Sequence, residues 1–440
     1  DVTALPSGVS TPAMFVFLYG VIMPLHFALG KPELAWSAGV AACFIGGFVE
    51  FCGGIIGPWL KKRIPRAALL GTVAGIGFIW MATQGVFDIL GDPMIGLPVL
   101  FVAILGLFGG YMFPKQIPPL VIAIVGGIVY ALCLGRIQPD FSGIGFYIPN
   151  PVNSIEHLID GFAIVAPYLT IIIPVEIYNF IETLDNVEAS NAAGDNYNVR
   201  EAQFADGICT MLSALCGGVI PNTVWLGHAG LKKSEAGIGY SLISGIVLGL
   251  SGIFGLFTFL NSVVPPAVCA ITFLWCAVVM VAQAFKDNDR KHYAAIAVAM
   301  VPPVADYLYT QVTGALSLAN LQTAVQNSGL NEYAADVTQM IKDAGVMWNG
   351  VPATKSGAII IGILLGTMVT FVIDKRLDKV GITALMGYVL SCFGFIHSAS
   401  LGFHPLSPFA IGYLIIAVLS FIFHAGRNTW FKGPDDFDYV

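Results

Sequence analysis

The sequence has few charged residues for its length. Of its 440 residues, only 11% are Asp, Glu, Lys or Arg, whereas 56% are hydrophobic. A water-soluble protein of this size could not cover its surface with so few charges, and apolar stretches of about 18 residues or more are typical of membrane-spanning helices. Such stretches recur along the chain, for example at Ala38–Leu60, Ile238–Phe259 and Gly357–Ile373. We therefore predict an all-α polytopic membrane protein.

Several kinds of motif are also missing. The eight cysteines lie in apolar segments without a Cys-x-x-Cys pair, which argues against a disulfide framework or a metal site. No Gly-x-Ser-x-Gly, His-Glu-x-x-His or phosphate-binding loop occurs in a suitable context, and no basic patch suits nucleic acid. We predict no enzyme activity, no cofactor, no bound metal and no nucleic-acid partner.

The basic residues are distributed unevenly over the predicted loops. Sixteen of the 20 Lys and Arg residues fall on one side, which the positive-inside rule makes cytoplasmic. The four exceptions are Lys31, Arg136, Lys342 and Lys355. This alternation requires Leu158–Asp185, Ala202–Leu215 and Pro221–Leu231 each to cross the bilayer or nearly so. It predicts about fourteen transmembrane segments with both ends in the cytoplasm. We expect the membrane to be a bacterial inner membrane.

The segment "IYNFIETLDNVEAS", Ile177–Ser190, places acidic residues inside a predicted span. On a helix, Tyr178, Glu182, Asp185 and Asn186 share one face. Carboxylates in a membrane are costly and commonly mark a substrate or proton path. For Asp185 and Glu188, solvation in the cytoplasmic interface is an equal or better interpretation. Glu182 lies one turn deeper, and we predict a functional role for it.

Two apolar regions are interrupted by Pro, Gly and hydroxyl residues: "ALPSGVSTPAMFVF", Ala4–Phe17, and "CGGVIPNTVWLGHAG", Cys216–Gly230. We expect each to be an extended piece followed by a helix, the second helix beginning near Asn222 or Thr223. Irregular backbone at membrane depth survives only where it lines a cavity or is buried in protein. The free N–H groups near Ser10–Pro12 and Asn222–Trp225 would suit acceptor atoms of a ligand. The alternative for the second region is a Pro-kinked helix with a packed histidine.

By the predicted crossings, the two interrupted segments enter the membrane from opposite sides. This arrangement is the signature of inverted repeats with a transport site between them. His228 lies beside the expected cavity, and its imidazole can change charge near neutral pH.

At these residues the chain resembles the nucleobase–ascorbate transporter family, also called xanthine/uracil permeases, most nearly its hypoxanthine/guanine branch. "IETLDNVEAS" resembles the Glu-bearing eighth helix, which makes Glu182 the substrate-binding acid and Asn186 a second polar residue. "IPNTVWLGHAG" resembles the strand and half-helix of the tenth helix, and "LPSGVSTPAMF" the break of the third.

The resemblance implies fourteen helices in two inverted repeats, core and gate domains, proton- or sodium-coupled uptake and commonly a homodimer. The chain departs from the family pattern at Gly227, where a Glu or Gln usually forms a second substrate clamp; His228 follows. It also leaves no room for the first two family helices, whereas two apolar segments follow the last one. Either the first pair is absent from this sequence or the C-terminal pair takes its place.

The resulting division of the chain follows the repeats. We expect a first repeat at 1–136 containing family helices three to seven, an extracytoplasmic loop at 137–157 and a second repeat at 158–316. An extracytoplasmic insertion at 317–350 and the last family-like helix at 351–379 follow. Two extra helices and a cytoplasmic tail complete the chain at 380–440.

We therefore predict a cation-coupled secondary transporter of a purine, a pyrimidine or a related planar solute. The substrate-binding candidates are Glu182, Asn186, Asn222, Thr223, Val224, Gly227, His228, Ser10, Thr11 and Pro12. The coupling candidates are Glu182, His228, Glu50 and Asp306. Helix-to-helix hydrogen bonding is the alternative for Glu50, and a capping or hinge role is the alternative for Asp306. The alternatives for the whole protein are a small-anion transporter (bicarbonate, sulfate or carboxylate) and a non-transporting membrane subunit.

Overall fold

The protein forms two compact units, each assembled from three parts of the chain. Unit 1 contains Asp1–Pro6, Ile76–Pro149 and Gly227–Gln283, and unit 2 contains Ser7–Gly75, Asn150–Leu226 and Ala284–Val440. The computed structural model describes residues 2–23, 25–26, 30–111, 113–114, 117–148, 151–192, 194–225, 228, 232, 236–286, 288–316, 341–342, 345–346, 348–398, 402–427 and 429–431.

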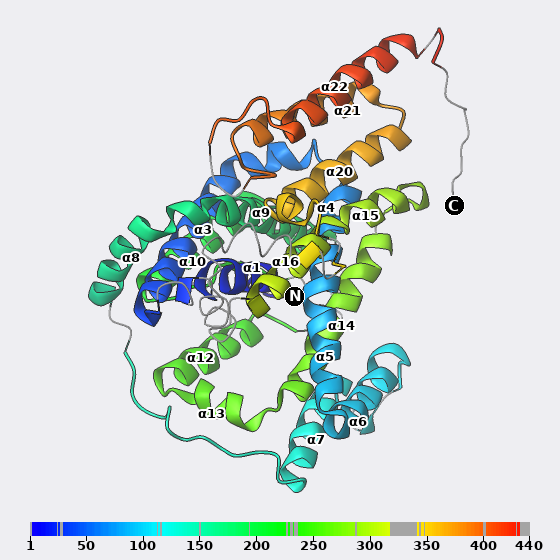
Figure 1. Ribbon diagram of the computed structural model, residues 1–440. Coiled ribbons are helices and arrows are strands. Elements are labelled where there is room, and N and C mark those ends of the chain that lie inside the picture. The colour runs from blue at the N-terminus through cyan, green and yellow to red at the C-terminus, as the bar shows by residue number, and fades with distance from the viewer. Residues whose placement is uncertain are drawn as a thin grey trace. The chain divides into compact units, whose positions relative to one another are not determined.

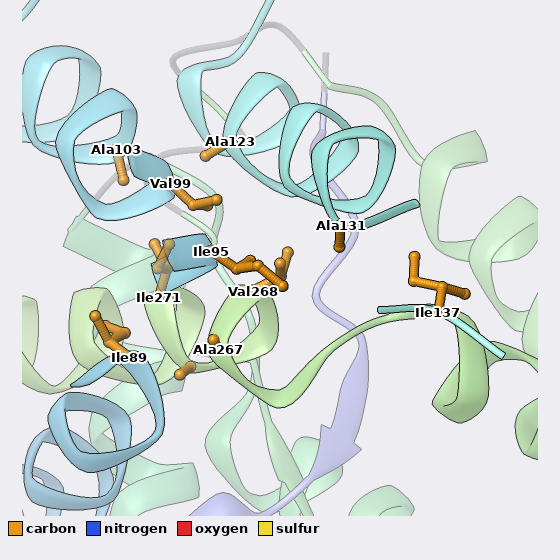
Figure 2. Close-up of a cluster of buried hydrophobic side chains, with 11 residues drawn as sticks. Ile89, Ile95, Val99, Ala103, Ala123, Ala131, Ile137, Ala267, Val268 and Ile271 are labelled. Carbon is orange, nitrogen blue, oxygen red and sulfur yellow. The ribbon is translucent and has the colours of Figure 1, made fainter. Parts of the chain in front are cut away.

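Unit 1 is helical. Its elements are the π-helices η2 (Gly77–Ala82) and η3 (Ile104–Phe108) and the α-helices α5 (Thr83–Gly91), α6 (Pro93–Ala103), α7 (Pro119–Cys133), α12 (Gly239–Ile253), α13 (Leu256–Val263) and α14 (Pro266–Lys286, whose last three residues belong to unit 2). Branched and small side chains of α5, α6, α7 and α14 point toward one another in its core, around Ile95, Val268 and Ile271 (Figure 2).

Within the described residues, unit 2 contains two strands and the helices that are not part of unit 1. Its strands are β1 (Ser7–Val9) and β2 (Asn222–Val224). Its helices are α1 (Thr11–Phe17), η1 (Leu18–Ile22), α3 (Pro32–Lys61), α4 (Arg66–Ile76), α8 (Pro151–Val165), η5 (Ala166–Tyr168), α9 (Leu169–Ala192), α10 (Val199–Leu215), η6 (Arg290–His292), α15 (Tyr293–Ala299), α16 (Pro302–Leu316), α19 (Val351–Lys355), α20 (Ala358–Ile373), α21 (Leu377–Cys392) and α22 (Pro408–Gly426). The last two helices lie side by side, and α21 also packs on α20 (Figure 1).

The two interrupted segments meet as a small antiparallel sheet. Ser7 pairs with Val224, Gly8 with Thr223 and Val9 with Asn222. Beyond the ladder, the Ser10 amide donates to the carbonyl of Pro221 at 2.9 Å, and α1 begins at the next residue. On the other side, α10 ends at Leu215 and the chain turns at Gly217, whose φ of +93° favours glycine.

Glycines on one face of α3 allow two other helices to approach it closely. A Cβ on Gly46 or Gly53 would lie 2.6 Å from Glu176 or Phe180 of α9. A Cβ on Gly47 would lie 2.8 Å from the carbonyl oxygen of Gly207 in α10. Small residues at helix contacts are the usual means of close packing in membranes. The same face of α3 therefore touches α9 and α10 together.

Two of the predicted apolar spans are sharply bent. Helices Ser154–Tyr168 and Ile171–Leu184 meet at 91°, and Gly239–Ile253 and Leu256–Val263 meet at 98°. Pro167, which has no amide hydrogen, lies at the first bend, and Gly255, with φ +65°, lies at the second. The predicted spans over Leu158–Asp185 and Ile238–Phe259 each contain a bent pair of helices rather than one straight helix.

Among the described residues, three helices are long and apolar enough to cross a membrane: Pro32–Gly57, Arg66–Gly91 and Pro408–Gly426. The number rises to five if each bent pair is one span. Shorter apolar helices, such as Ala358–Ile373, accompany them. The total of about fourteen crossings and the repeat boundaries stay predictions.

The insertion expected at 317–350 is described only near its end, since residues 317–340 lie outside the described residues, as does the tail from residue 432. Ile341, Trp348 and Val351 form a small apolar cluster with α16. The Trp348 ring stacks on Tyr309 with ring centroids 5.5 Å apart. The end of the insertion is therefore anchored on α16.

An ion pair joins η6 to the end of α20. Asp374 accepts hydrogen bonds from Lys291 Nζ at 2.8 Å and His292 Nε2 at 2.9 Å. Partial burial tends to raise the pKa of Asp374, but these bonds outweigh it and lower the pKa below its ordinary value. The hydrogen bond to Asp374 raises the pKa of Lys291. The pair is therefore charged over a wide pH range.

We expect Gly207→Ala to separate α3 from α10, because its Cβ would lie 2.7 Å from the Gly47 carbonyl oxygen. Overpacking of this kind costs about 1–3 kcal/mol. Thermal unfolding in detergent should show a lower melting temperature. Gly126→Ala and Gly245→Ala, where the added methyl meets nothing within 4 Å, are the controls. Equal melting temperatures for Gly207→Ala and the native protein would contradict the close contact.

We expect the Asp374 contribution to stability to be fully present above the ordinary Asp pKa of about 4. It should be lost as the pH falls through the lowered pKa of the folded state, because the folded protein must then take up a proton. Melting temperatures between about pH 7 and pH 3 should therefore decline less steeply for Asp374→Asn than for the native protein. Asp160→Asn, at an exposed position of α8, is the control. Parallel curves for Asp374→Asn and the native protein would exclude this role.

Candidate functional site

A buried polar face of α9 forms the centre of the site. Glu176, Asn179, Thr183 and Asn186 follow one another at intervals of three or four residues and therefore share one side of the helix. Their side chains are 0–3% exposed. Through their hydrogen bonds, these side chains connect the face to β2, α3 and α10.

Two asparagines of α9 bind the backbone of β2. Asn179 Nδ2 donates to the carbonyl of Asn222, and Asn186 Nδ2 donates to the carbonyl of Val224, both at 2.7 Å. Residues two apart in a strand direct their backbone groups to the same edge. One edge of β2 therefore binds α9, while Thr223 and Pro221 face β1 on the other edge.

The Thr183 hydroxyl links the strand to a buried acid. Thr183 Oγ1 lies 2.8 Å from Glu50 Oε1, 3.0 Å from Thr223 Oγ1 and 3.4 Å from the Val224 amide nitrogen. A hydroxyl donates one hydrogen bond and accepts up to two. The shortest contact indicates that Thr183 donates to Glu50 and accepts from β2.

Glu50 of α3 is buried at the point where α3 meets α9 and α10. It also accepts a hydrogen bond from Asn179 Nδ2 at 3.3 Å, and Thr183 Oγ1, which binds Glu50, lies 3.4 Å from Asp206 Oδ2 of α10. Asn179 Nδ2 reaches Glu176 Oε2 at 3.5 Å. Glu50, Asp206 and Glu176 are all fully buried, and three ionised carboxylates are too costly to bury together in an apolar interior. The cluster of Glu50, Asp206 and Glu176 is thus arranged to hold a proton.

The predicted substrate residues on α9 occupy different positions. Asn186 belongs to the buried face and holds β2. Glu182, the residue before Thr183, is half-buried on an adjoining face. The side chains of Tyr178, Asp185 and Glu188 lie outside the described residues. Glu182 and Asn186 are therefore close along the helix but lie on different faces of it.

The second interrupted segment differs from its prediction. Asn222, Thr223 and Val224 form a strand, so the half-helix expected from Asn222 or Thr223 does not begin there. Thr223 and Val224 are β-branched, and the exposed edge of β1 offers a partner for them. The expected N–H donors are also engaged: the Asn222 amide donates to Thr210 Oγ1 at 3.1 Å, and the Val224 amide points to Thr183.

The first interrupted segment agrees with its prediction, since an extended piece leads into α1 at Thr11 and Pro12. The side chains of these two residues lie outside the described residues. Ser10 is buried, and its amide is bound to Pro221. The Ser10 amide is therefore a structural donor that fixes the end of the ladder, and the expectation that it is free for a ligand is wrong.

The remaining candidates lie elsewhere. His228 belongs to unit 1, where its Nε2 is 3.3 Å from the carbonyl of Thr3. Gly227 lies outside the described residues. Asp306 and Lys355 line a small cavity of about 30 Å³ in unit 2, beside Val16 of α1 and Val175 of α9. Within the described residues, no group of three or more His, Cys, Asp or Glu is placed to hold a metal ion.

Sequence reasoning missed five members of the site: Glu176, Asn179, Thr183, Asp206 and Thr210. Glu176 and Asp206 carry the same signal that singled out Glu182, a carboxylate inside an apolar segment. The spacing of Asn179, Thr183 and Asn186 is equally visible on a helix. Only the contact of these residues with a strand that is distant in sequence cannot be predicted from local sequence patterns.

We expect Thr183→Val to leave the buried Glu50 oxygen without its closest donor and β2 without an acceptor. An unsatisfied buried polar group costs about 1–3 kcal/mol. The melting temperature in detergent should fall, and transport should fall with it. Thr183→Ser, which keeps the hydroxyl, is the control and should stay near the native values. If the valine and serine variants behave alike, the hydroxyl does not connect α9 with Glu50.

Comparison with known proteins agrees with this architecture. Residues 4–302 match the xanthine/uracil permease model, described as "Permease family". A search of curated proteins found no match. The transmembrane domain of the cyanobacterium bicarbonate transporter BicA is similar with a TM-score of 0.53 and 19% identity, over 70% of this chain and 84% of that one. SLC26A9 gives a TM-score of 0.49 and 11% identity, over 69% of this chain and 55% of that one.

The similarity to BicA concerns the fold, because the identity is low. The family model, by contrast, covers more than half of the chain. Its members are transporters rather than enzymes, with small-molecule substrates and a place in the membrane. The protein therefore belongs to the xanthine/uracil permease family and is an integral-membrane secondary transporter with broken helices.

Proposed function

We propose that the protein couples proton movement to the uptake of a nucleobase or a related planar solute, as in the hypoxanthine/guanine branch of its family. The predicted setting is a bacterial inner membrane with both ends of the chain in the cytoplasm, and the predicted assembly is a homodimer. The observation that carries the proposal is the buried cluster of Glu50, Asp206 and Glu176, next to the strand that α9 holds in place.

The coupling step follows from the cost of buried charge. Isolated ionised carboxylates are too costly to leave unpaired in an apolar interior, so a proton held between Glu50 and Asp206 stabilises the closed cluster. Loss of the proton would leave two negative charges beside Glu176. The hydrogen bonds of Thr183 and Asn179 to Glu50 would then rearrange, and with them the attachment of β2. The attachment of β2 would therefore depend on the protonation state of the carboxyl cluster.

The substrate step uses Glu182. Its carboxylate is half-buried and directly precedes Thr183 on α9. A carboxylate accepts hydrogen bonds only, which suits the N–H groups of a purine or pyrimidine. Binding at Glu182 and proton binding at Glu50 therefore act on neighbouring residues of one helix. Asn186, which holds Val224, is assigned to positioning rather than to substrate contact. His228 and Asp306 stay candidates for coupling.

We expect native protein in liposomes to accumulate hypoxanthine, guanine, xanthine or uracil when the outside is acidic. Glu182→Gln should lower uptake about ten- to a hundredfold, the effect of losing one hydrogen bond to a charged group. Glu156→Gln, at an exposed position of α8, is the matched control. Glu50→Gln should still bind substrate in a thermal-shift assay but no longer respond to the pH gradient. Undiminished pH-driven uptake by Glu50→Gln would contradict the proton assignment.

The second candidate is a small anion such as bicarbonate, sulfate or a carboxylate. Gly227 favours it, because a glycine stands where the family usually has a second clamp for the planar ring. An anion would be repelled by an ionised Glu182, so Glu182→Gln should then keep or improve transport. BicA is a bicarbonate transporter, which makes bicarbonate the first anion to assay. A protein that neither transports nor is thermally stabilised by any of these solutes would be a non-transporting subunit.

A further inference from the structure

The connection between α21 and α22 reaches back to the short helix α19. His397, in this connection, donates its backbone N–H to the carbonyl of Ser356 at 2.8 Å. Its imidazole Nδ1 lies 3.2 Å from the carbonyl oxygen of Ala353. The last carbonyl groups of a helix have no partners within the helix itself. One residue of the C-terminal helix pair therefore contacts two carbonyls at the end of α19.

These contacts determine the tautomer of His397. A carbonyl oxygen can only accept, so Nδ1 carries the hydrogen and donates it to Ala353. In the neutral ring Nε2 is then an acceptor for the hydroxyl of Tyr413, 3.0 Å away on α22. The ring also stacks on Phe409 of α22, with ring centroids 4.2 Å apart. The imidazole thus joins α22 to α19, and we call these contacts of His397 the His397 clamp.

The backbone at the clamp is closely constrained. The φ of His397 is +62°, in the left-handed region where residues other than glycine are uncommon. In this conformation the N–H group and the imidazole both reach the end of α19. On the opposite side of the contact, a Cβ on Gly357 would lie 2.7 Å from Ile396 Cγ2. Unusual backbone conformations persist where the surrounding contacts require them, so the clamp is a specific connection.

The clamp holds the backbone on both sides of Lys355. This lysine is the last residue of α19, between Ala353 and Ser356. Its ammonium group interacts electrostatically with Asp306 of α16, and Lys355 Nζ lies 5.0 Å from the centroid of the Tyr309 ring on the same helix. Opposite charges attract more strongly where water is scarce. The end of α19 therefore presents a counter-charge to Asp306.

This charge pair lies where α16 and α20 meet the helices of the candidate site. Both side chains line the cavity of about 30 Å³, and Val16 of α1 and Val175 of α9 line it as well. Val175 directly precedes Glu176 of the carboxyl cluster, and α1 follows β1. A charge without its partner would be costly beside these apolar side chains. The position of Lys355 therefore affects how α16 and α20 pack against α1 and α9.

We infer that His397 is a positioning residue: by fixing the end of α19, it keeps Lys355 beside Asp306 as its counter-ion. The last two helices thereby control the charge at a contact with the helices that carry the candidate site. This role goes beyond the proposed function, since it requires no particular substrate or coupling ion.

The test measures the reactivity of Lys355 in the full-length protein purified in detergent. Its amine is acetylated with an N-hydroxysuccinimide ester, and mass spectrometry follows the modified fraction, with the exposed Lys62 and Lys286 as internal references. His397→Gly removes the imidazole but permits the left-handed backbone. His397→Asn tolerates the same backbone and keeps a short N–H donor in place of Nδ1. Asp306→Asn removes the charge that attracts Lys355.

The matched control is Ser407→Ala, in the same connection between α21 and α22. Ser407 Oγ accepts a hydrogen bond from the Ala410 amide at 3.1 Å and caps the start of α22. Loss of this cap destabilises the same helix without removing a contact of the His397 clamp. Thermal unfolding of each variant establishes that it is folded.

We expect Lys355 to be acetylated about two- to tenfold faster in His397→Gly than in the native protein, the effect of losing one hydrogen bond that holds the end of α19. Acetylation should also be faster in Asp306→Asn, whereas His397→Asn and Ser407→Ala should stay near the native rate.

An unchanged rate in His397→Gly overturns the inference, and so does an equally fast rate in His397→Asn, because the Nδ1 hydrogen bond would then not hold α19. An equal acceleration in Ser407→Ala also overturns it, since the whole helix pair would then be loosened. If the glycine variant does not fold, Asp306→Asn still decides: an unchanged rate there means that Asp306 does not hold Lys355. Uptake is not measured, so these outcomes are independent of the transport proposal.

Discussion

Strand β2 has only three residues, and its backbone groups must be satisfied inside a protein with an apolar environment. Unpaired amide and carbonyl groups are costly where water is absent. One edge of the strand pairs with β1, and the other is bound by Asn179, Asn186, Thr183 and Thr210. These side chains from α9 and α10 substitute for a third strand. The site depends on this substitution, because the same side chains also contact the buried acids.

The close packing of α3 brings the acids to the strand. Because Gly46, Gly47 and Gly53 have no side chains, α9 and α10 can both approach the face that carries Glu50. A larger residue at any of these glycines would move the helices apart and lengthen the hydrogen bonds of Thr183 to Glu50 and Asp206. Packing, strand pairing and proton binding are thus linked through short contacts within one unit. A change in the packing, the strand pairing or the proton binding should therefore alter the other two.

Part of this arrangement follows from the sequence. Proline, glycine and hydroxyl residues in apolar surroundings predicted both interruptions, and the motifs around Glu182 predicted the family. The face of α9 was predicted less well: the spacing of Tyr178 and Glu182 suggested one side, whereas Asn179 and Thr183 define the buried side. Both series include Asn186. The charge of Glu182 makes it conspicuous in the sequence, but the buried side of α9 is determined by the elements that pack against the helix.

The rest depends on contacts between distant parts of the chain. Ser7 and Val224 are far apart in sequence, and no local pattern shows that they pair. Without β1 as a partner, "PNTVW" reads as the start of a helix, as we expected. The bends of about a right angle at Pro167 and Gly255 could likewise not be predicted, because each lies within a continuous apolar segment. The composition of a segment predicts that it is buried, whereas the course of its backbone depends on the elements that pack against it.

The central claim is that proton binding by the carboxyl cluster is coupled to substrate binding. Calorimetric titration of the purified protein with its nucleobase, in buffers of different ionisation enthalpy, measures this directly. The apparent binding enthalpy should vary with the buffer and reveal a net exchange of protons with the solution, and the dependence should vanish in Glu50→Gln. A binding enthalpy that is the same in every buffer, or a buffer dependence that persists in Glu50→Gln, would contradict the account.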